Sequence, residues 1–392
     1  MNKIYSNRIQ NLKTSATIAI STLAGELKAK GRDILSFSTG EPDFDTPEMV
    51  KDFARLALNK GLTKYTPVAG VKELKEAIVY KLQKENNLSY TPNQIIVSNG
   101  AKQALFNAFA ALIQQDDEVL IPTPYWVTYP ELVTYHGGKN VFLETTIESN
   151  FKVSAKQIKE AINPKTRILV LTTPSNPTGM VYSKSELKEI AEVLKGTNVW
   201  VIADEIYEKL IYEGKFVSAG AISSDMFDRV ITINGLSKSA AMTGWRIGYL
   251  ASSDTNLVKL MTNLQSQCTS NVNSITQYAS IPVLRGEVKK DIKAMRKAFL
   301  ERRDIAVKMI NNINGFSVKS PQGAFYLFID IRGLKRFNGN SMEFCKAALN
   351  ELNLAFVPGS AFGMDGFIRM SFACSNKAIK KGLTRLEAFK EC

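Results

Sequence analysis

The chain has 392 residues, of which 45% are hydrophobic and 22% charged, an ordinary globular composition that suits roughly two to three domains. Lys and Arg number 50 against 37 for Asp and Glu, so the net charge is +13, which attracts anions but does not set a function. The longest apolar runs, such as residues 108–113, are far shorter than the ~18 residues of a transmembrane helix, and the polar opening MNKIYSNRIQNLK does not resemble a secretory signal, so we expect no membrane partner.

Cysteine and histidine usage excludes two further kinds of site. The four cysteines are widely separated and form no C-x-x-C pair, which favours reduced thiols in the cytoplasm over a disulfide framework. The only histidine, His136, excludes a His-rich metal site, and we expect no metal. Acid–base chemistry is therefore left to Lys, Asp, Glu or Tyr side chains.

Short apolar strands alternate with amphipathic helices through most of the chain. The pattern predicts strands at residues 94–97, 118–121, 168–171, 199–203, 230–233 and 247–250. It predicts helices at residues 101–113, 185–194 and 257–266. Strands separated by helices are typical of a mainly parallel sheet covered on both faces, in which the functional loops lie beyond the carboxyl ends of the strands.

The last hundred residues have a different pattern. A long charged helix is predicted at residues 289–312, and then strands such as FYLFIDI and GFIRMSFA mix with a helix at residues 342–352. We expect an N-terminal segment, residues 1–45, that packs on the small domain, a large domain at residues 46–288, and a small α+β domain at residues 289–392. No basic stripe interleaved with aromatics occurs, so nucleic acid is not an expected partner.

Polar residues follow two of the predicted strands. In VWVIADEIYE an apolar strand ends on Asp204 and Glu205, with Tyr207 just beyond, and in ILVLTTPSNPTG another strand runs into Asn176. Each feature has a structural explanation of its own, because acids favour helix N-termini and the sequence N-P-T-G forms turns.

Two more strand ends carry a lysine and a glycine. VITINGLSKSAAMTGWRIGYL leads to Ser237 and Lys238, with Arg246 eight residues after the lysine, and QIIVSNGAKQALF reaches Gly100 at a predicted helix start. Taken alone, the lysine fits a surface loop and the glycine fits any strand–helix junction. Neither G-x-x-x-x-G-K-[ST] nor G-x-G-x-x-G occurs, so nucleotide-binding loops are not indicated.

Together, the four strand ends have a chemical logic. A lysine whose pKa is lowered can form a Schiff base with a carbonyl cofactor. A carboxylate opposite keeps a pyridinium nitrogen protonated, which makes the ring an electron sink. Ser237, Arg246 and the helix start at residues 100–102 could hold a phosphate, the arginine through paired donors.

The sequence resembles the class I aminotransferases, which depend on pyridoxal phosphate and have fold type I, over essentially its whole length. TGEPDFDTP, NPTG, ADEIY, the Ser-Lys pair before MTGWRIGY and FIRMSFA occur in the family's order, and this ordered set is far more specific than any one motif. The resemblance implies an α/β fold, with a mostly parallel seven-stranded sheet in a large domain and a smaller α+β domain. It also implies pyridoxal 5′-phosphate as the cofactor and a homodimer with shared active sites.

The resemblance assigns roles around the cofactor ring. Lys238 resembles the lysine that binds the cofactor and then serves as general base and acid. Asp204 matches the partner of the pyridine nitrogen, and Tyr207 matches the donor to the phenolic oxygen. Asn176 matches the residue that contacts this oxygen and the substrate carboxylate. Trp126, in PTPYWVTYP, resembles the aromatic stacked on the ring, although core packing would also explain it.

Further positions match the residues that bind phosphate and the α-carboxylate. The implied phosphate site consists of Gly100, Ala101, Lys102, Ser237 and Arg246, with Tyr65 reaching it from the neighbouring subunit. Arg369 in FIRMSFA matches the arginine that pairs with the substrate α-carboxylate, near the Gly40 backbone. An arginine in so apolar a strand would otherwise be an unpaired charge, which favours the functional interpretation.

The substrate follows from a finer resemblance. GAKQALFNAF resembles the aspartate-type enzymes of the bacterial Iβ subgroup, in which a lysine at the place of Lys102 helps bind the distal carboxylate and a threonine matches Thr17. Lys13 matches a lysine associated with prephenate, but a solvated N-terminal lysine is an equal explanation. The resemblance implies an aspartate:2-oxoglutarate aminotransferase working by ping-pong half-reactions, and leaves prephenate open as a further substrate.

Three alternatives stay open at this point. The same cofactor could serve a transaminase for alanine or aromatic acids, or a lyase or decarboxylase, because the fold does not fix the reaction. A binding protein could have kept the scaffold, although it would not need the whole proton-transfer set. The net charge of +13 could also serve nucleic-acid binding.

Overall fold

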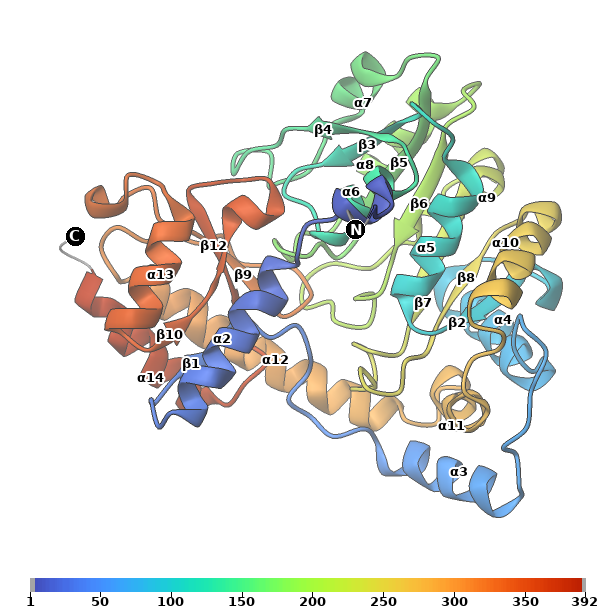
Figure 1. The fold of residues 1–392 in the computed structure, drawn as a ribbon, viewed down its shortest axis with the longest axis horizontal. Helices are drawn as coiled ribbons and strands as arrows, with labels where there is room; N and C mark the ends of the chain where they lie inside the picture. Colours follow the sequence, from blue (N-terminus) through green and yellow to red (C-terminus); the bar gives the residue numbers. More distant parts are fainter. Residues whose placement is uncertain (1–3, 390–392) are drawn as a thin grey trace.

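A seven-stranded sheet forms the centre of the molecule (Figure 1). The computed structural model describes residues 4–389, apart from the side chains of Ala16 and Thr17. The strands lie in the order β2-β8-β7-β6-β5-β3-β4, with β8 antiparallel to both neighbours and the other pairs parallel. Their bounds are β2 Ile95–Ser98, β3 Glu118–Pro122, β4 Lys139–Leu143, β5 Thr166–Thr172, β6 Trp200–Asp204, β7 Val230–Gly235 and β8 Gly248–Ala251. The mostly parallel sheet of the sequence prediction is confirmed.

The sequence predicts six of these strands but not β4. The six have near-continuous apolar runs because they are buried on both faces. β4, in contrast, lies at the sheet edge, and its side chains before Leu143 are exposed or only half-buried. Its sequence KNVFL therefore lacks the apolar run on which the prediction depends.

Helices cover both faces of this sheet. Along β6, Ile202 packs into a cluster with Leu105 of α5, whereas Val201 and Ala203 pack with Leu187 of α8, as the alternation of side chains in a strand requires. The helices of this part are α3 Glu48–Asn59, α4 Lys72–Asn86, α5 Ala101–Leu112, α6 Thr128–Tyr135, α7 Ala155–Ala161, α8 Lys184–Leu194, α9 Ser224–Arg229, α10 Thr255–Cys268 and α11 Ser274–Leu284. No helix within residues 4–389 has the length and apolar composition that crossing a bilayer would require.

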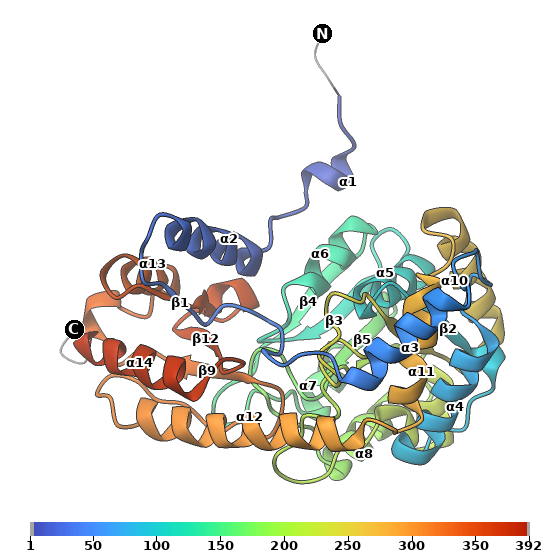
Figure 2. The same ribbon diagram turned by 90° about the horizontal axis from the view of Figure 1, so that it is seen from below.

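The C-terminal part has its own small sheet and core, joined to the central sheet by the long helix α12 Lys289–Ile310 (Figures 1 and 2). Its three antiparallel strands are β11 Val357–Pro358, β12 Phe367–Ser371 and β9 Tyr326–Asp330. Two helices, α13 Ser341–Glu351 and α14 Asn376–Leu386, add Phe344 and Leu383 to a core rich in aromatic residues. We propose residues 289–392 as the small domain and residues 46–288 as the large one.

The N-terminal residues reach both parts of the molecule. β1 Leu35–Ser36 pairs in parallel with β10 Leu354–Ala355 of the C-terminal part, and α2 Ala16–Ala29 lies near β10 and β11. Figure 2 shows α1 Asn7–Gln10 projecting from the body of the molecule. The loop between α2 and α3 passes Gly40 along the gap between the two sheets, where the candidate site lies.

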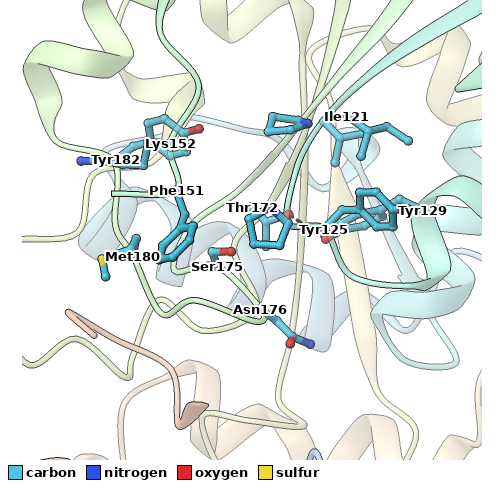
Figure 3. Close-up of a pocket in the computed structure, with 13 residues that line it drawn as sticks. Ile121, Tyr125, Tyr129, Phe151, Lys152, Thr172, Ser175, Asn176, Met180 and Tyr182 are labelled. Carbon is cyan, nitrogen blue, oxygen red and sulfur yellow. Dashed lines mark hydrogen bonds between the residues drawn. The ribbon is translucent and has the colours of Figure 1, made fainter. Parts of the chain in front are cut away.

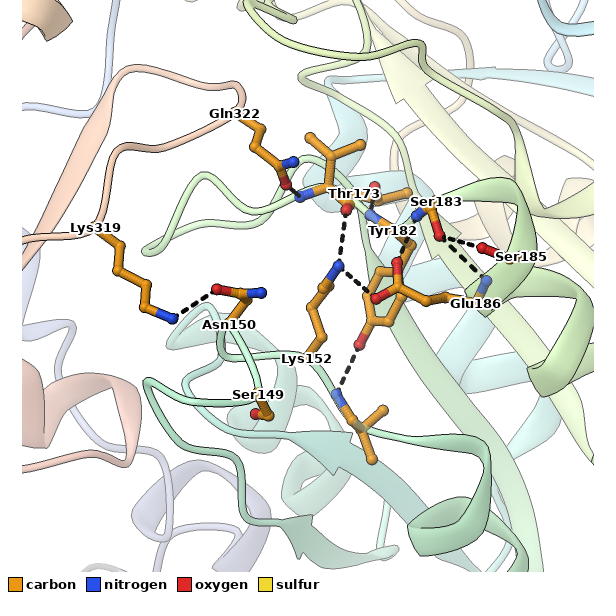
Figure 4. A network of polar contacts seen from close by, with 12 residues as sticks. Ser149, Asn150, Lys152, Thr173, Tyr182, Ser183, Ser185, Glu186, Lys319 and Gln322 are labelled. Carbon is orange, nitrogen blue, oxygen red and sulfur yellow. Dashed lines mark hydrogen bonds and ion pairs between the residues drawn. The ribbon is translucent and has the colours of Figure 1, made fainter.

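Polar contacts hold the C-terminal part against the central part on the other side of the site (Figure 4). The Lys319 ammonium donates to Ile147 O at 2.5 Å and to Asn150 Oδ1 at 2.8 Å. Gln322 Oε1 accepts from Val181 N at 3.1 Å. The contact between Gln322 and Val181 ties the segment after Asn176 to the C-terminal part, whereas those of Lys319 tie the loop at residues 147–150 to it.

Candidate active site

An open cavity of about 260 Å³ lies between the carboxyl ends of the central strands and the small sheet. Most of the residues singled out from the sequence line it, although they come from segments that are far apart in the chain. These lining residues are Gly40, Ala101, Lys102, Trp126, Asn176, Asp204, Tyr207, Ser237, Lys238, Arg246 and Arg369. The structure therefore assembles one site from the separate strand ends.

Asp204 lies at the floor of the cavity, at the end of β6. Its neighbour across the sheet is Thr172 at the end of β5, because the two parallel strands are in register. The Tyr129 hydroxyl donates to Asp204 Oδ2 at 2.7 Å. Burial raises the pKa of Asp204, while Tyr129 and Lys238 act against this rise. The carboxylate is thus a buried acceptor aimed at the same space as the lysine.

Lys238 follows β7 in a tight turn and reaches across the cavity. Its Nζ donates to Gly40 O at 2.5 Å. Burial lowers the pKa of Lys238 to about 8, although Glu41 acts in the opposite direction. An amine with this pKa is neutral in about a tenth of the molecules at pH 7, far more often than an ordinary lysine, and the neutral form is the one that can attack a carbonyl carbon.

Arg369 is the most deeply buried cation of the site. It lies in the middle of β12 with 2% of its surface exposed, and its guanidinium stacks 4.4 Å from the ring centroid of Tyr326. Its Nη1 donates to Asn176 Oδ1 at 3.0 Å and its Nη2 to Ser38 O at 2.9 Å. Among the described residues, its Nε has no hydrogen-bond partner and no carboxylate pairs with this arginine. A buried guanidinium that lacks a counter-anion indicates a site for an anionic ligand.

The loop that brings Asn176 to Arg369 depends on Gly179. Gly179 has a φ of 69°, which favours glycine, and a Cβ there would lie 2.5 Å from Gly323 O. Gly323 N in turn donates to Gly179 O at 2.8 Å. The glycine of N-P-T-G therefore has a structural role, which is to let the small-domain segment approach this loop closely.

Arg246 and the start of α5 form a second anion-binding corner. The Arg246 guanidinium donates to Thr243 O at 2.9 Å and to Asn99 O at 3.3 Å, which places it over Gly100. Gly100 has a φ of 80°, and a Cβ there would lie 2.5 Å from Arg246 Nη2. The free N–H groups of the first turn of α5, with buried Ser237 and this guanidinium, suit a phosphate group.

Two side chains near this corner bound the open side of the cavity. The Lys102 ammonium lies 5.0 Å from the ring centroid of Trp126, and the rings of Trp126 and Tyr129 form a T-shaped contact with an interplanar angle of 87°. Loss of hydration lowers the pKa of Lys102, and the charge of Arg246 lowers it further. Trp126 is half-buried and faces the cavity, so it is not only a core residue.

Some predicted residues lie elsewhere. Tyr65 is 91% exposed and is not part of the cavity lining. The exposed Lys13 donates its backbone N–H to Glu131 Oε2 at 2.9 Å. The side chain of Thr17 lies outside the described residues, and Ser15 and Ile18, on either side of it, line the cavity.

The structure also adds residues that the sequence did not point to. Tyr207 forms a hydrogen bond with Tyr326, since the two hydroxyl oxygens lie 2.9 Å apart. Burial raises the pKa of both phenols. Tyr129 and Thr172 join Asp204. These side chains occur in ordinary apolar or turn segments, so no local pattern distinguishes them.

The described lining has a strong excess of positive charge. Lys102, Lys238, Arg246 and Arg369 are cations, and Asp204 is the carboxylate among these lining residues. Such a cavity suits a ligand set with several negative charges, for example a phosphate ester together with a dicarboxylic acid.

Comparison with known proteins agrees with this chemistry. The family model described as aminotransferase class I and II matches residues 32–386. An aspartate aminotransferase of Bacillus sp. (strain YM-2) is 43% identical, with 99% of this chain and 100% of that protein covered. A probable aspartate/prephenate aminotransferase of Aquifex aeolicus is also 43% identical, with 99% and 98% covered. The solved aspartate aminotransferase of Thermus thermophilus with maleate superposes with a TM-score of 0.95 at 39% identity, covering 99% of this chain and 100% of that chain.

Proposed function

The chain belongs to the family of class I and II aminotransferases, and from this premise we propose that it transfers the amino group of aspartate to 2-oxoglutarate with the help of pyridoxal 5′-phosphate. The observation that carries the substrate class is the lining of the cavity, in which four cations face one carboxylate. A cofactor phosphate and the two carboxylates of the substrate would balance these charges.

The residues present fit this cofactor. The corner of Gly100, Ala101, Ser237 and Arg246 would hold its phosphate, and Asp204 would pair with its pyridine nitrogen. Trp126 would lie against one face of the ring, while Tyr207 and Asn176 would donate to its phenolic oxygen. When bound, pyridoxal phosphate supplies an electron sink for the substrate α-carbon.

Lys238 is the residue that we assign to proton transfer. Its ammonium lies within the cavity, and its pKa of about 8 lets it hold and release a proton near neutral pH. It would bind the cofactor in the resting enzyme and, once displaced by the substrate amine, move a proton at the substrate α-carbon. The contact with Gly40 O gives the free ammonium a fixed place.

Two cations at different depths would bind the substrate carboxylates. Arg369, with its unpartnered Nε, would take the α-carboxylate through paired donors, supported by Asn176 and the Gly40 backbone. Lys102 would take the distal carboxylate from the open side. Because Lys102 is a flexible point charge, we infer that dicarboxylates of different length are accepted.

Prephenate is a second substrate that we keep in the proposal. Relatives that include the Aquifex aeolicus protein are named aspartate/prephenate aminotransferases. Lys13 would contact this bulkier dicarboxylate, and its exposed position leaves the side chain free to turn towards the cavity mouth. Arogenate, the amino acid formed from prephenate, should then convert the bound cofactor to its amine form.

We also propose a cytoplasmic homodimer. Arg246 is exposed in the single chain, and a groove beside it is lined by Trp245, Asn273 and Thr276. A second copy placed there would bring its exposed Tyr65 to the phosphate corner. Sedimentation should then give twice the chain mass.

A spectrophotometric half-reaction tests the proposal. The protein with its cofactor is mixed separately with aspartate, arogenate, alanine and phenylalanine, and the absorbance band of the bound cofactor is followed. Rapid loss with aspartate and little with alanine is the expected result. Conversion only by monocarboxylic amino acids would overturn the substrate, and keto-acid formation without an amino acceptor would indicate a lyase instead.

A further inference from the structure

Tyr129 connects three elements of the site. It is 1% exposed in the first turn of α6, and its hydroxyl lies 2.7 Å from Asp204 Oδ2 and 2.8 Å from Thr172 Oγ1. Thr172 and Asp204 end the adjacent strands β5 and β6 at the same level of the sheet. One phenol therefore ties the helix to both strand ends.

The chemistry of these groups fixes the direction of the hydrogen bonds. An ionised carboxylate only accepts, so the phenol proton of Tyr129 points to Asp204. The phenol oxygen is then free to accept from the hydroxyl of Thr172. Burial raises the pKa of Tyr129, so the phenol keeps its proton and stays a donor. The result is a donor chain from Thr172 through Tyr129 to Asp204.

This chain has a consequence for the carboxylate. Burial would favour the protonated form of Asp204, and a hydrogen bond to the charged form opposes that tendency. It also occupies Oδ2, whereas Oδ1 accepts, within the described part of the chain, only from Ile206 N, at 3.3 Å. Oδ1 is thus the oxygen with capacity for one more donor.

Tyr129 also forms a wall between two cavities. A small rear cavity of about 30 Å³ lies behind the site, and both Tyr129 and Thr172 line it as well as the main cavity (Figure 3). The Tyr129 ring also packs against Trp126 in a T-shaped contact, with a centroid distance of 5.5 Å. The same residue therefore orients the carboxylate and braces the aromatic that bounds the main cavity.

We propose that Tyr129 is a positioning residue for the cofactor, which acts through Asp204 and is itself oriented by Thr172. Its hydroxyl keeps the Asp204 carboxylate ionised and leaves the other oxygen for the pyridine nitrogen. The proposal rests on the proposed function, because it requires that Asp204 meets that nitrogen.

Cofactor binding to Tyr129→Phe tests the proposal. This variant keeps the ring and its contact with Trp126 but loses the hydroxyl. Titration of the cofactor-free protein with pyridoxal 5′-phosphate should give a dissociation constant raised about tenfold or more, the effect of losing a hydrogen bond to a charged group. With ¹⁵N-labelled cofactor, the chemical shift of the pyridine nitrogen should move towards that of the neutral ring.

Thr172→Val gives a second, independent measurement if the tyrosine variant does not fold. Thr172→Val should change the dissociation constant and the chemical shift of the pyridine nitrogen in the same direction as Tyr129→Phe, but by less. Thr172→Ser should restore the wild-type values. Tyr182→Phe is the matched control, because the buried Tyr182 hydroxyl accepts from Val153 N at 3.1 Å and lines the rear cavity without touching Asp204. It should bind cofactor as the wild type does.

The outcomes separate the two proposals. If the wild-type protein binds no pyridoxal 5′-phosphate, the proposed function fails. If the wild type binds it and Tyr129→Phe has the same dissociation constant and the same nitrogen shift, the positioning role is refuted and Tyr129 is only a core residue. An equal loss in Tyr182→Phe would likewise refute it, since any buried hydroxyl would then matter.

Discussion

The two ends of the cavity are built in different ways. At the inner end, Asp204 and Arg369 are buried, lie in regular strands and have fixed neutral partners. At the open end, Lys102 is exposed, and its ammonium lies over the face of Trp126 rather than against a hydrogen-bond acceptor. The inner end therefore holds its groups in one geometry, which the proposed proton transfer needs, whereas the open end can adapt to the substrate.

This difference also predicts the cost of mutation. A buried cation or carboxylate leaves unpaired partners behind when it is removed, so its loss is expensive. A cation at the open end, such as Lys102, keeps part of its hydration, so its removal costs less free energy. Substitutions at the inner end should therefore stop the reaction or the binding, and those at the open end should change the choice of substrate.

Replacement of Lys238 should have the largest effect. Lys238→Ala removes the amine that binds the cofactor and the group that moves the proton, so no turnover above background is expected, while the far-ultraviolet circular dichroism stays unchanged. Assays of the amino-group transfer, with exposed Lys259→Ala as control, check this result. Substantial transamination by the Lys238 variant would refute the assignment.

Arg369→Ala should weaken the binding of amino acid and keto acid together, because both carry the α-carboxylate. The expected loss is ~2–5 kcal/mol for each, the range for truncating one partner of a buried charge pair. Dissociation constants from half-reaction titrations measure it. Arg369→Lys keeps the charge but loses the planar guanidinium, so its dissociation constants should lie between those of the wild type and those of Arg369→Ala. Wild-type affinity of Arg369→Ala for both ligands would contradict the role.

Glu205 is a buried carboxyl next to the inner end of the cavity, and it tests whether burial controls the properties of ionisable groups there. It directly follows Asp204 but accepts from Ser218 Oγ at 2.7 Å and Ala219 N at 3.0 Å, and its Oε2 has no partner among residues 4–389. Burial raises the pKa of Glu205 to about 8.

The folded state therefore binds this proton more tightly than the unfolded chain, and the stability that it contributes is lost as the pH rises from about 4.5 through about 8. A difference of one between the folded and unfolded pKa values of a group corresponds to ~1.4 kcal/mol of stability. Glu205→Gln should reduce this loss, which denaturant unfolding at pH 5, 7 and 9 would measure. An unchanged pH dependence would mean that Glu205 stays ionised in the fold.

The sequence predicts the inner end better than the open end, for a physical reason. Asp204 and Lys238 follow long apolar strands, and Arg369 interrupts one, so local pattern is enough to mark them. Tyr129 and Thr172 act only through contacts between elements far apart in the chain, and no local pattern reveals such contacts. The edge strand β4 and the two-residue strands, such as β1, escape prediction because they lack a buried apolar run.

Lys102→Gln should have the smallest effect and the most specific one. If Lys102 binds the distal carboxylate, kcat/KM for aspartate should fall by up to about fivefold, the scale of an exposed charge pair, while that for alanine stays unchanged. The ratio of the two constants is the quantity to measure, with Lys259→Gln as control. An equal fall for both amino acids would show instead that Lys102 acts on the cofactor phosphate. The open end would then not discriminate by this charge, and selectivity would have to come from the α2 start, where Ser15 and Ile18 face the cavity.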